Sequence, residues 1–139
     1  MAELDGVLFK EIVEQALREF PNECCGLIAA EADVPVKVFP MTNADASPST
    51  YRFDGTEQLK VFGELDDRGW DIWSIYHSHT HSAAYPSPTD VKRAHYPDGS
   101  PTYPGTRYIV VSLLDREAPV ARSFLFVDGE VTEEELSIR

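Results

Sequence analysis

Residues 70–76, WDIWSIY, form an almost unbroken apolar and aromatic run in the middle of the chain. The run is shorter than an ordinary buried helix and rich in residues that favour strands, so it predicts a strand at the centre of a sheet. It leads directly into YHSHTHS, where three of the 4 histidines occupy alternate positions. The segment that organises the fold therefore also ends in side chains suited to chemistry.

Further helices and strands are predicted on both sides of this segment. Apolar residues at helical spacing predict a first helix that ends at Pro21, namely Phe9, Ile12, Val13, Ala16, Leu17 and Phe20. Asp54 and Glu57 have the spacing of a capping box for a second helix that ends near Asp67. Asp128-Gly129 predicts the turn of a hairpin. The other predicted elements are strands at 24–30, 34–39, 51–54 and 107–114, a third helix at 87–96 and the hairpin at 121–136.

Helices thus alternate with strands, and the last strands come as a hairpin. This order predicts an α/β fold with a single mixed β-sheet and helices packed on it. A chain of 139 residues can bury one sizeable core, so a single domain over residues 1–139 is expected.

The charge balance narrows the class of partner. The chain carries 24 acidic and 12 basic residues, a net charge of −12, so no nucleic-acid partner is expected. No apolar run approaches ~18 residues, and the start lacks a signal-peptide pattern, so no membrane association is expected. Cys24 and Cys25 are adjacent, unsuited to a mutual disulfide, and interpreted as small core residues. The expected location is cytoplasmic.

The histidine stretch has two interpretations. Residues His77 and His79 of an extended strand point to the same side, and Asp90 follows at the start of the next helix. Two histidines and a carboxylate suit a catalytic zinc ion with one position left open for water. Alternatively, Ser87 is simply an N-cap, Pro88 sits at N1 and Asp90 at N3 of a well-formed helix start. Spacing alone leaves both interpretations open, and they are compatible.

A longer pattern adds specificity. His77-Ser78-His79, seven residues, Ser87, two residues and Asp90 form H-x-H-x7-S-x2-D. The chain resembles the JAMM (MPN+) metallopeptidases, whose members cleave peptide or isopeptide bonds at the C-terminus of ubiquitin and ubiquitin-like proteins. The segment PNECCGL supplies the upstream glutamate, Glu23. MTNADASPSTYRFD and GEVTEEEL are most similar to the small bacterial Mec-type members that act on sulfur-carrier adducts.

The resemblance implies the JAMM/MPN, cytidine-deaminase-like architecture and a role for each motif residue. His77, His79 and Asp90 would hold Zn²⁺, Glu23 would be the general base, and Ser87 would donate a hydrogen bond to the oxyanion. Two features depart from the family pattern. Thr80 stands where many members carry proline, and His81 is an additional histidine, interpreted as a residue on the solvent or substrate side.

The leading functional hypothesis that follows is a zinc peptidase. Its substrate would be a ubiquitin-like sulfur-carrier protein with an adduct after its C-terminal Gly-Gly, and cysteine is a candidate for the released residue. The alternatives are a zinc hydrolase of other small peptides and a non-catalytic MPN-type scaffold. The loops at 41–50 and 80–86 are expected to flank the substrate groove.

Overall fold

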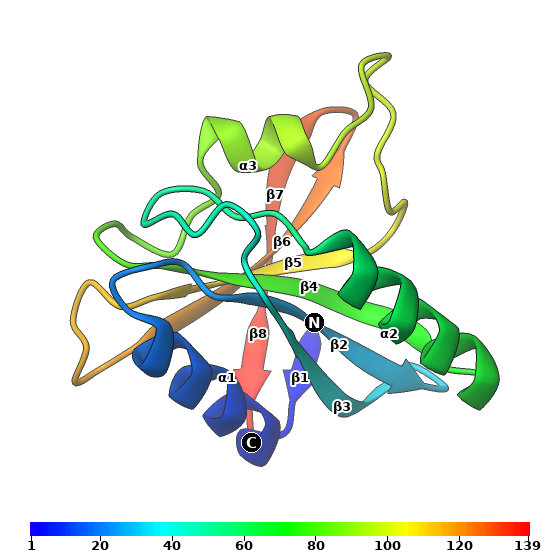
Figure 1. Cartoon of the computed structure of the whole chain (residues 1–139), viewed down its shortest axis with the longest axis horizontal. Coiled ribbons are helices and arrows are strands. Elements are labelled where there is room, and N and C mark those ends of the chain that lie inside the picture. The colour runs from blue at the N-terminus through cyan, green and yellow to red at the C-terminus, as the bar shows by residue number, and fades with distance from the viewer.

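A mixed six-stranded sheet organises the computed structural model, which describes all 139 residues (Figure 1). Only the β4–β5 pair is parallel, and β4 lies in the interior of the sheet, as the apolar run at 70–76 predicts. The strands, in their order across the sheet, are β3 (Val34–Met41), β2 (Cys25–Glu31), β4 (Asp71–His79), β5 (Arg107–Ser112), β6 (Val120–Val127) and β7 (Glu130–Glu134).

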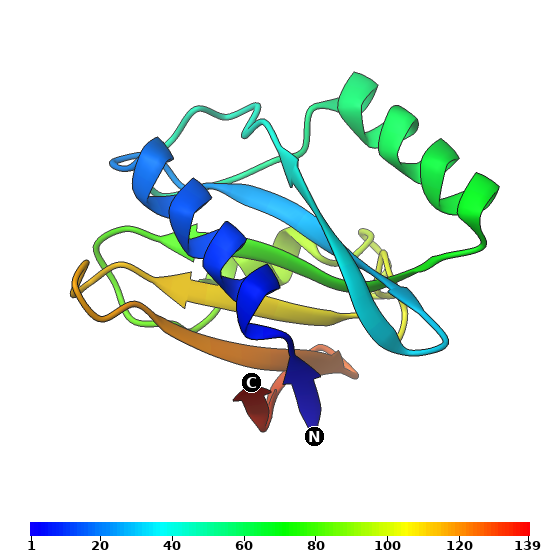
Figure 2. The same cartoon turned by 90° about the horizontal axis from the view of Figure 1, so that it is seen from below.

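The helices cover opposite faces of this sheet. α1 (Gly6–Glu19) packs on one face, and Figure 2 shows it crossing in front of the strands. α2 (Gly55–Arg68) and α3 (Pro88–Arg93) lie on the other face, where Leu65 and Ala94 join its apolar clusters. The predicted class, a mixed α/β fold with one multi-stranded sheet and packed helices, is therefore confirmed.

The α1 face of the sheet is fixed by a hydrogen-bonded trio. Tyr76 of β4 donates its hydroxyl to the Gln15 side chain, which donates in turn to the carbonyl of Cys25 at 2.9 Å. The Tyr76 ring crosses β2 at Gly26, where an added Cβ would collide with the ring and with the Phe39 carbonyl. Gly26 is thus required by close approach of a side chain to the backbone.

Local predictions differ from the structure at four places. Residues 51–54 form no strand and make only an isolated bridge between Asn43 and Phe53, because the Asn43 side chain, rather than a neighbouring strand, accepts the Arg52 N–H. Asp54 caps α2, but Glu57 completes no capping box because its carboxylate binds the backbone and hydroxyl of Thr42.

The helices show the other differences. α3 ends at Arg93 rather than near residue 96, since the chain turns back to pair His95 with Pro101. On α1, Leu17 is exposed and Gln15 is buried, because the Tyr76 and Cys25 partners make burial of an amide favourable.

The two ends of the chain form a second sheet that the sequence did not predict. β1 (Ala2–Leu4) and β8 (Leu136–Ile138) pair in parallel, and Gly6 N–H donates to the carbonyl of Arg139. Both strands are only three residues long, too short for a periodic signal. None of the three helices is long and apolar enough to cross a membrane.

Candidate metal centre

The end of β4 and the start of α3 bring three possible metal ligands together. His77 and His79 lie two residues apart on β4 and point to the same face of the sheet. Their Nε2 atoms are 3.1 Å apart, and Oδ2 of Asp90 lies 2.9 Å from Nε2 of His77 and 3.0 Å from Nε2 of His79. All three side chains are buried. The predicted trio is therefore a cluster that can hold a metal ion.

The geometry and the donor types of this cluster fit zinc. Tetrahedral ligands at about 2.0–2.1 Å from zinc lie roughly 3.3 Å from one another, close to the spacing of the three atoms. Two imidazole nitrogens and one carboxylate oxygen are a ligand set of catalytic zinc, and they leave a fourth position open.

Neighbouring groups orient the ligands. His79 Nδ1 lies 2.9 Å from the carbonyl of Ala83, which fixes Nδ1 as the protonated nitrogen and leaves the lone pair on Nε2 for a metal. The ring of His77 stacks on Tyr51, with the ring centroids 4.3 Å apart. The backbone N–H of Ser87 donates to Oδ2 of Asp90 at 2.9 Å. Each ligand is thus held before any ion binds.

The charges within the cluster are adjusted by burial and by mutual hydrogen bonds. Burial lowers the pKa of His77. Burial also opposes protonation of His79, but its bond to Asp90 raises the pKa of that imidazole overall. Burial alone would raise the pKa of Asp90, whereas the two histidines hold it well below its usual range. Asp90 is therefore an anion at neutral pH, as a ligand must be.

Glu23 lies beside the cluster because of strand register. Cys25 of β2 pairs with His77, so Glu23, two residues earlier, extends toward His79 on the same face. The carboxyl is buried, and its Oε1 atom has no hydrogen-bond partner. Burial raises the pKa of Glu23 to about 8, with an opposing contribution from His79. A carboxyl with a pKa near neutrality can both take and return a proton.

Residues that the motif does not include hold Glu23 in place. Cys24 N–H donates to Oγ of Ser78 at 2.8 Å, and Ser78 N–H donates to the Cys24 carbonyl at 3.1 Å. The Asn43 amide donates to the Glu23 carbonyl at 3.1 Å. Ser78, between the two ligand histidines, thus holds Cys24, the residue next to Glu23. The position of Ser78 between His77 and His79 is evident in the sequence, but its pairing with Cys24 is not.

The loops at 41–50 and 80–86 contact each other, and the first also contacts Glu23. Glu23 N–H donates to the carbonyl of Ser47, and the Thr80 hydroxyl donates to the carbonyl of Pro48 at 3.1 Å. Thr80, which replaces the family's proline, therefore ties the loops at 41–50 and 80–86 together. Its hydroxyl also lies 2.8 Å from Nδ1 of His81, whose side chain is exposed. His81 takes no part in the ligand cluster.

Ser87 is the N-cap of α3. Its Oγ accepts the N–H of Asp90 at 3.0 Å, and the reciprocal bond from Ser87 N–H to Asp90 completes a capping box. The interpretation of Ser87 as a helix N-cap is thus correct. Its hydroxyl proton makes no hydrogen bond within the chain, so the hydroxyl can still donate to a substrate oxygen.

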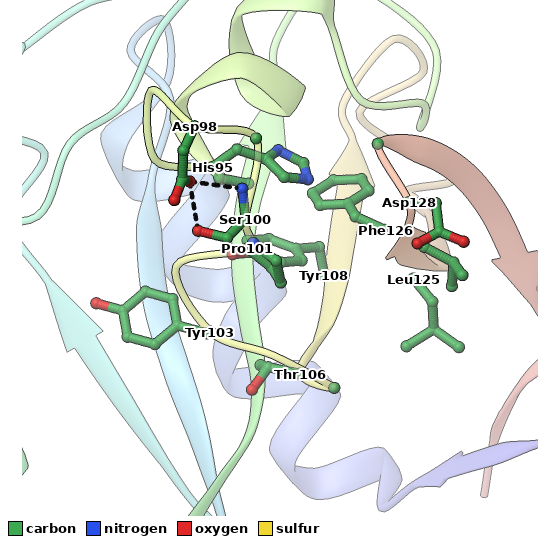
Figure 3. A pocket seen from close by; sticks show the side chains of 15 residues that line it. His95, Asp98, Ser100, Pro101, Tyr103, Thr106, Tyr108, Leu125, Phe126 and Asp128 are labelled. Atoms are coloured by element: carbon green, nitrogen blue, oxygen red, sulfur yellow. Dashed lines mark hydrogen bonds between the residues drawn. The ribbon is translucent and has the colours of Figure 1, made fainter.

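The largest cavity of the protein, about 670 Å³, is not at this centre. It lies between the end of α3 and the β6–β7 hairpin, where His95, Phe126 and Tyr108 line it (Figure 3). None of the predicted site residues borders it. His95, which falls within the range predicted for the third helix, lies beyond the helix end and packs against Phe126.

The mixed sheet with packed helices is the fold of JAB1/MPN domains. A JAB1/MPN domain protein from Archaeoglobus fulgidus superposes with a TM-score of 0.61 at 19% identity, over 99% of this chain and 98% of that one.

The chain belongs to the Prok-JAB family, the prokaryotic homologues of the JAB domain, whose model matches residues 6–127. A relative in Mycobacterium tuberculosis named CysO-cysteine peptidase is 43% identical over 133 residues, which cover 94% of this chain and 86% of the relative. A probable TtuB-protein conjugate cleaving protease of Thermus thermophilus is 39% identical over 90 residues, 64% of this chain and 60% of that protein. The chain is accordingly a hydrolase of the JAMM/MPN+ peptidase type, against the alternative of a non-catalytic scaffold.

Proposed function

We propose that this protein is a zinc peptidase that hydrolyses the peptide or isopeptide bond after the C-terminal Gly-Gly of a ubiquitin-like sulfur-carrier protein, with cysteine as a candidate leaving residue. The observation that carries the proposal is the convergence of three ligand atoms within about 3 Å beside an unpartnered buried carboxyl, that of Glu23. The name of the mycobacterial relative supports a carrier adduct as the substrate.

In this proposal His77, His79 and Asp90 hold the zinc ion, Glu23 is the general base and Ser87 is an oxyanion donor. Zinc, when bound, supplies Lewis acidity that brings the pKa of a water molecule toward ~7. The Glu23 carboxylate accepts a proton as the water oxygen bonds to the glycyl carbonyl carbon, and it returns the proton to the leaving amine as the C–N bond breaks. The products are a carrier ending in a glycine carboxylate and a free amine.

Ser87 contributes at a different atom. Its Oγ keeps one lone pair on the Asp90 N–H and directs its unused proton to the oxygen of the tetrahedral intermediate. The capping bond fixes the serine in place, so that the hydroxyl is oriented before the substrate arrives. We further propose that one domain, residues 1–139, carries out this reaction in the cytoplasm.

The test is incubation of zinc-loaded protein with carrier proteins that end in Gly-Gly-cysteine, Gly-Gly-dipeptide or a lysine-linked conjugate. Mass spectrometry should detect the carrier ending in Gly-Gly, and chelator or the variant Glu23→Gln should suppress its formation. Cleavage of short free peptides without cleavage of any carrier adduct would favour the alternative, a zinc hydrolase of other small peptides.

A further inference from the structure

A second depression, of about 380 Å³, opens on the metal-bearing face of the sheet. Its floor is mostly apolar and aromatic and includes Tyr51, Ile75 and Tyr108. Arg52 and Arg93 stand at its edge with their guanidinium groups partly exposed. An apolar hollow with a few convergent polar groups has the character of a small-molecule site.

This depression adjoins the metal centre through three connections. Tyr51 lines it and also stacks on His77 with the ring planes 20° apart. Ile75 precedes His77 by two residues on β4 and lies on the same face. Arg93 follows Asp90 by three residues on α3, so the two side chains share one side of the helix. The ring of Tyr51 therefore borders both the depression and the ion site.

The two arginines are preorganised and only partly neutralised. Asp45 accepts from Nη1 of Arg93 at 2.6 Å and from Nε of Arg52 at 3.2 Å. Nη1 of Arg93 also donates to the carbonyl of Tyr51 at 3.0 Å. Two cations share one carboxylate, which leaves one net positive charge, and Nη2 of Arg93 and both Nη atoms of Arg52 make no hydrogen bond within the chain. In a protein of net charge −12, this local excess of positive charge favours an anion.

We propose that this depression receives the residue on the leaving side of the scissile bond, and that Arg93 and Arg52 bind its free α-carboxylate. The inference rests on the proposed function and narrows its substrate class. The protein would release a single C-terminal amino acid from the carrier, in preference to cleaving a conjugate through a lysine side chain. A lysine-linked conjugate presents no α-carboxylate at that position.

Tyr51 connects the arginine pair to the metal centre. Nη1 of Arg93 donates to its backbone carbonyl at 3.0 Å, and its ring stacks on the ligand His77. The volume of the depression suits side chains of different sizes, so the carboxylate, rather than a thiol, is the principal determinant.

The experiment compares two substrates that differ only at the carboxylate. A carrier ending in Gly-Gly-cysteine is made as the free acid and as the C-terminal carboxamide, and a second pair ends in Gly-Gly-alanine. Wild-type protein should cleave each acid with a kcat/KM about 10- to 100-fold above that of its amide, the usual worth of a hydrogen-bonded charge. A lysine-linked conjugate should be cleaved no faster than the amides.

Variants assign the preference to the arginines. Arg93→Gln should bring the acid-to-amide ratio close to one, Arg93→Lys should restore part of it, and Arg52→Gln should reduce it less. Arg68→Gln is the matched control, because Arg68 is 51% exposed against 46% for Arg93 and is likewise paired with one carboxylate, that of Glu64. The control should keep the wild-type ratio. Thermal midpoints of all variants show whether each remains folded.

The outcomes separate this inference from the proposed function. Equal cleavage of acid and amide by the wild type overturns the carboxylate site while the peptidase assignment stands. An unchanged ratio in folded Arg93→Gln also overturns it, as does cleavage of the lysine-linked conjugate at the rate of the acid adduct. Cleavage of none of the carrier substrates overturns the proposed function and this inference together.

Discussion

Strand β4 presents one face to α1 and the other to the metal centre, and the two faces differ in how their buried polar groups are satisfied. On the α1 face, Tyr76 is bonded to Gln15, and Ser78 is bonded to Cys24. On the metal face, Oε1 of Glu23 and Nδ1 of His77 are buried without a partner. The strand thus borders a satisfied network on one side and unsatisfied, titratable groups on the other.

The difference separates stability from chemistry within a single strand. A satisfied buried network adds rigidity, whereas an unpaired buried polar atom costs about 1–3 kcal/mol. The register of β2 against β4 holds Glu23 in its costly position, and that register is fixed by backbone bonds. Changes on the metal face should therefore alter activity more than stability, and changes on the α1 face should do the reverse.

The largest expected effect follows from removing two ligands. His77→Ala combined with His79→Ala should abolish metal binding and lower activity by about 10³-fold or more, since the ion is worth several kcal/mol in the transition state. Elemental analysis of protein purified without chelator should give about one zinc per wild-type chain and none in the variant. An unchanged metal content would disprove the assignment of the ligands.

Removing the proposed base should have the next largest effect. Glu23→Gln should keep the metal and the fold, because Glu23 is not in the ligand cluster, and should lower kcat by roughly 10²-fold or more. Turnover like that of the wild type with zinc still bound would remove Glu23 from the mechanism.

The same variant should reveal the cost of the buried carboxyl. The folded-state pKa of Glu23 is about 8, above the ordinary value of 4.5. The free energy of unfolding of the wild type, relative to that of the glutamine variant, is therefore highest below about pH 4.5 and is lowered as the pH rises through 8. Metal-free Glu23→Gln should melt a few degrees above metal-free wild type at pH 8–9 and show little difference near pH 5. Equal melting temperatures across this range would mean that the carboxyl is hydrated.

Ser87 lies at the boundary between structure and chemistry. Asparagine and aspartate cap helices as well as serine does, so Ser87→Asn and Ser87→Asp should keep the thermal midpoint. If the hydroxyl also donates to the oxyanion, kcat on a carrier adduct should fall by roughly 10²-fold, and further for aspartate because of its negative charge. Full activity in Ser87→Asn would leave Ser87 with the capping role alone.

The smallest effect on activity is expected on the α1 face. Tyr76→Phe leaves the Gln15 carbonyl oxygen without its buried donor and should lower the free energy of unfolding by about 1–2 kcal/mol, or the midpoint by about 3–8 °C. Metal content and kcat should equal those of the wild type. A loss of zinc in this variant would show that the two faces of β4 are not independent.

The sequence predicted the metal face of β4 better than its α1 face. Alternation in β4 and the spacing to Asp90 indicated which side chains meet, because both depend on local geometry. The apolar run at 70–76 and the Asp128-Gly129 turn likewise predicted a central strand and a hairpin, and both form. The JAMM resemblance supplied Glu23, which spacing alone would not have placed beside His79.

What the sequence did not predict depends on contacts between distant segments. Asn43 bonds to the carbonyls of Glu23 and Thr50 and accepts the N–H of Arg52, so a polar segment that was expected to form a strand is a braced loop instead. Gln15 is buried because its partners come from β4 and β2. Side-chain to backbone bonds across 20 or more residues, such as that from Asn43 to Glu23, leave no periodic signal in a sequence.

Oδ2 of Asp90 serves two structures at once, since it faces both histidines and also accepts the N–H of Ser87. An ion bound to that oxygen withdraws electron density from it and so weakens the hydrogen bond that it accepts from the N–H of Ser87. Occupancy of the centre and order at the start of α3 are therefore thermodynamically linked. Amide hydrogen exchange at Ser87 should respond to chelation while exchange in β4 does not, which makes this one amide a spectroscopic reporter of metal loading in the absence of substrate.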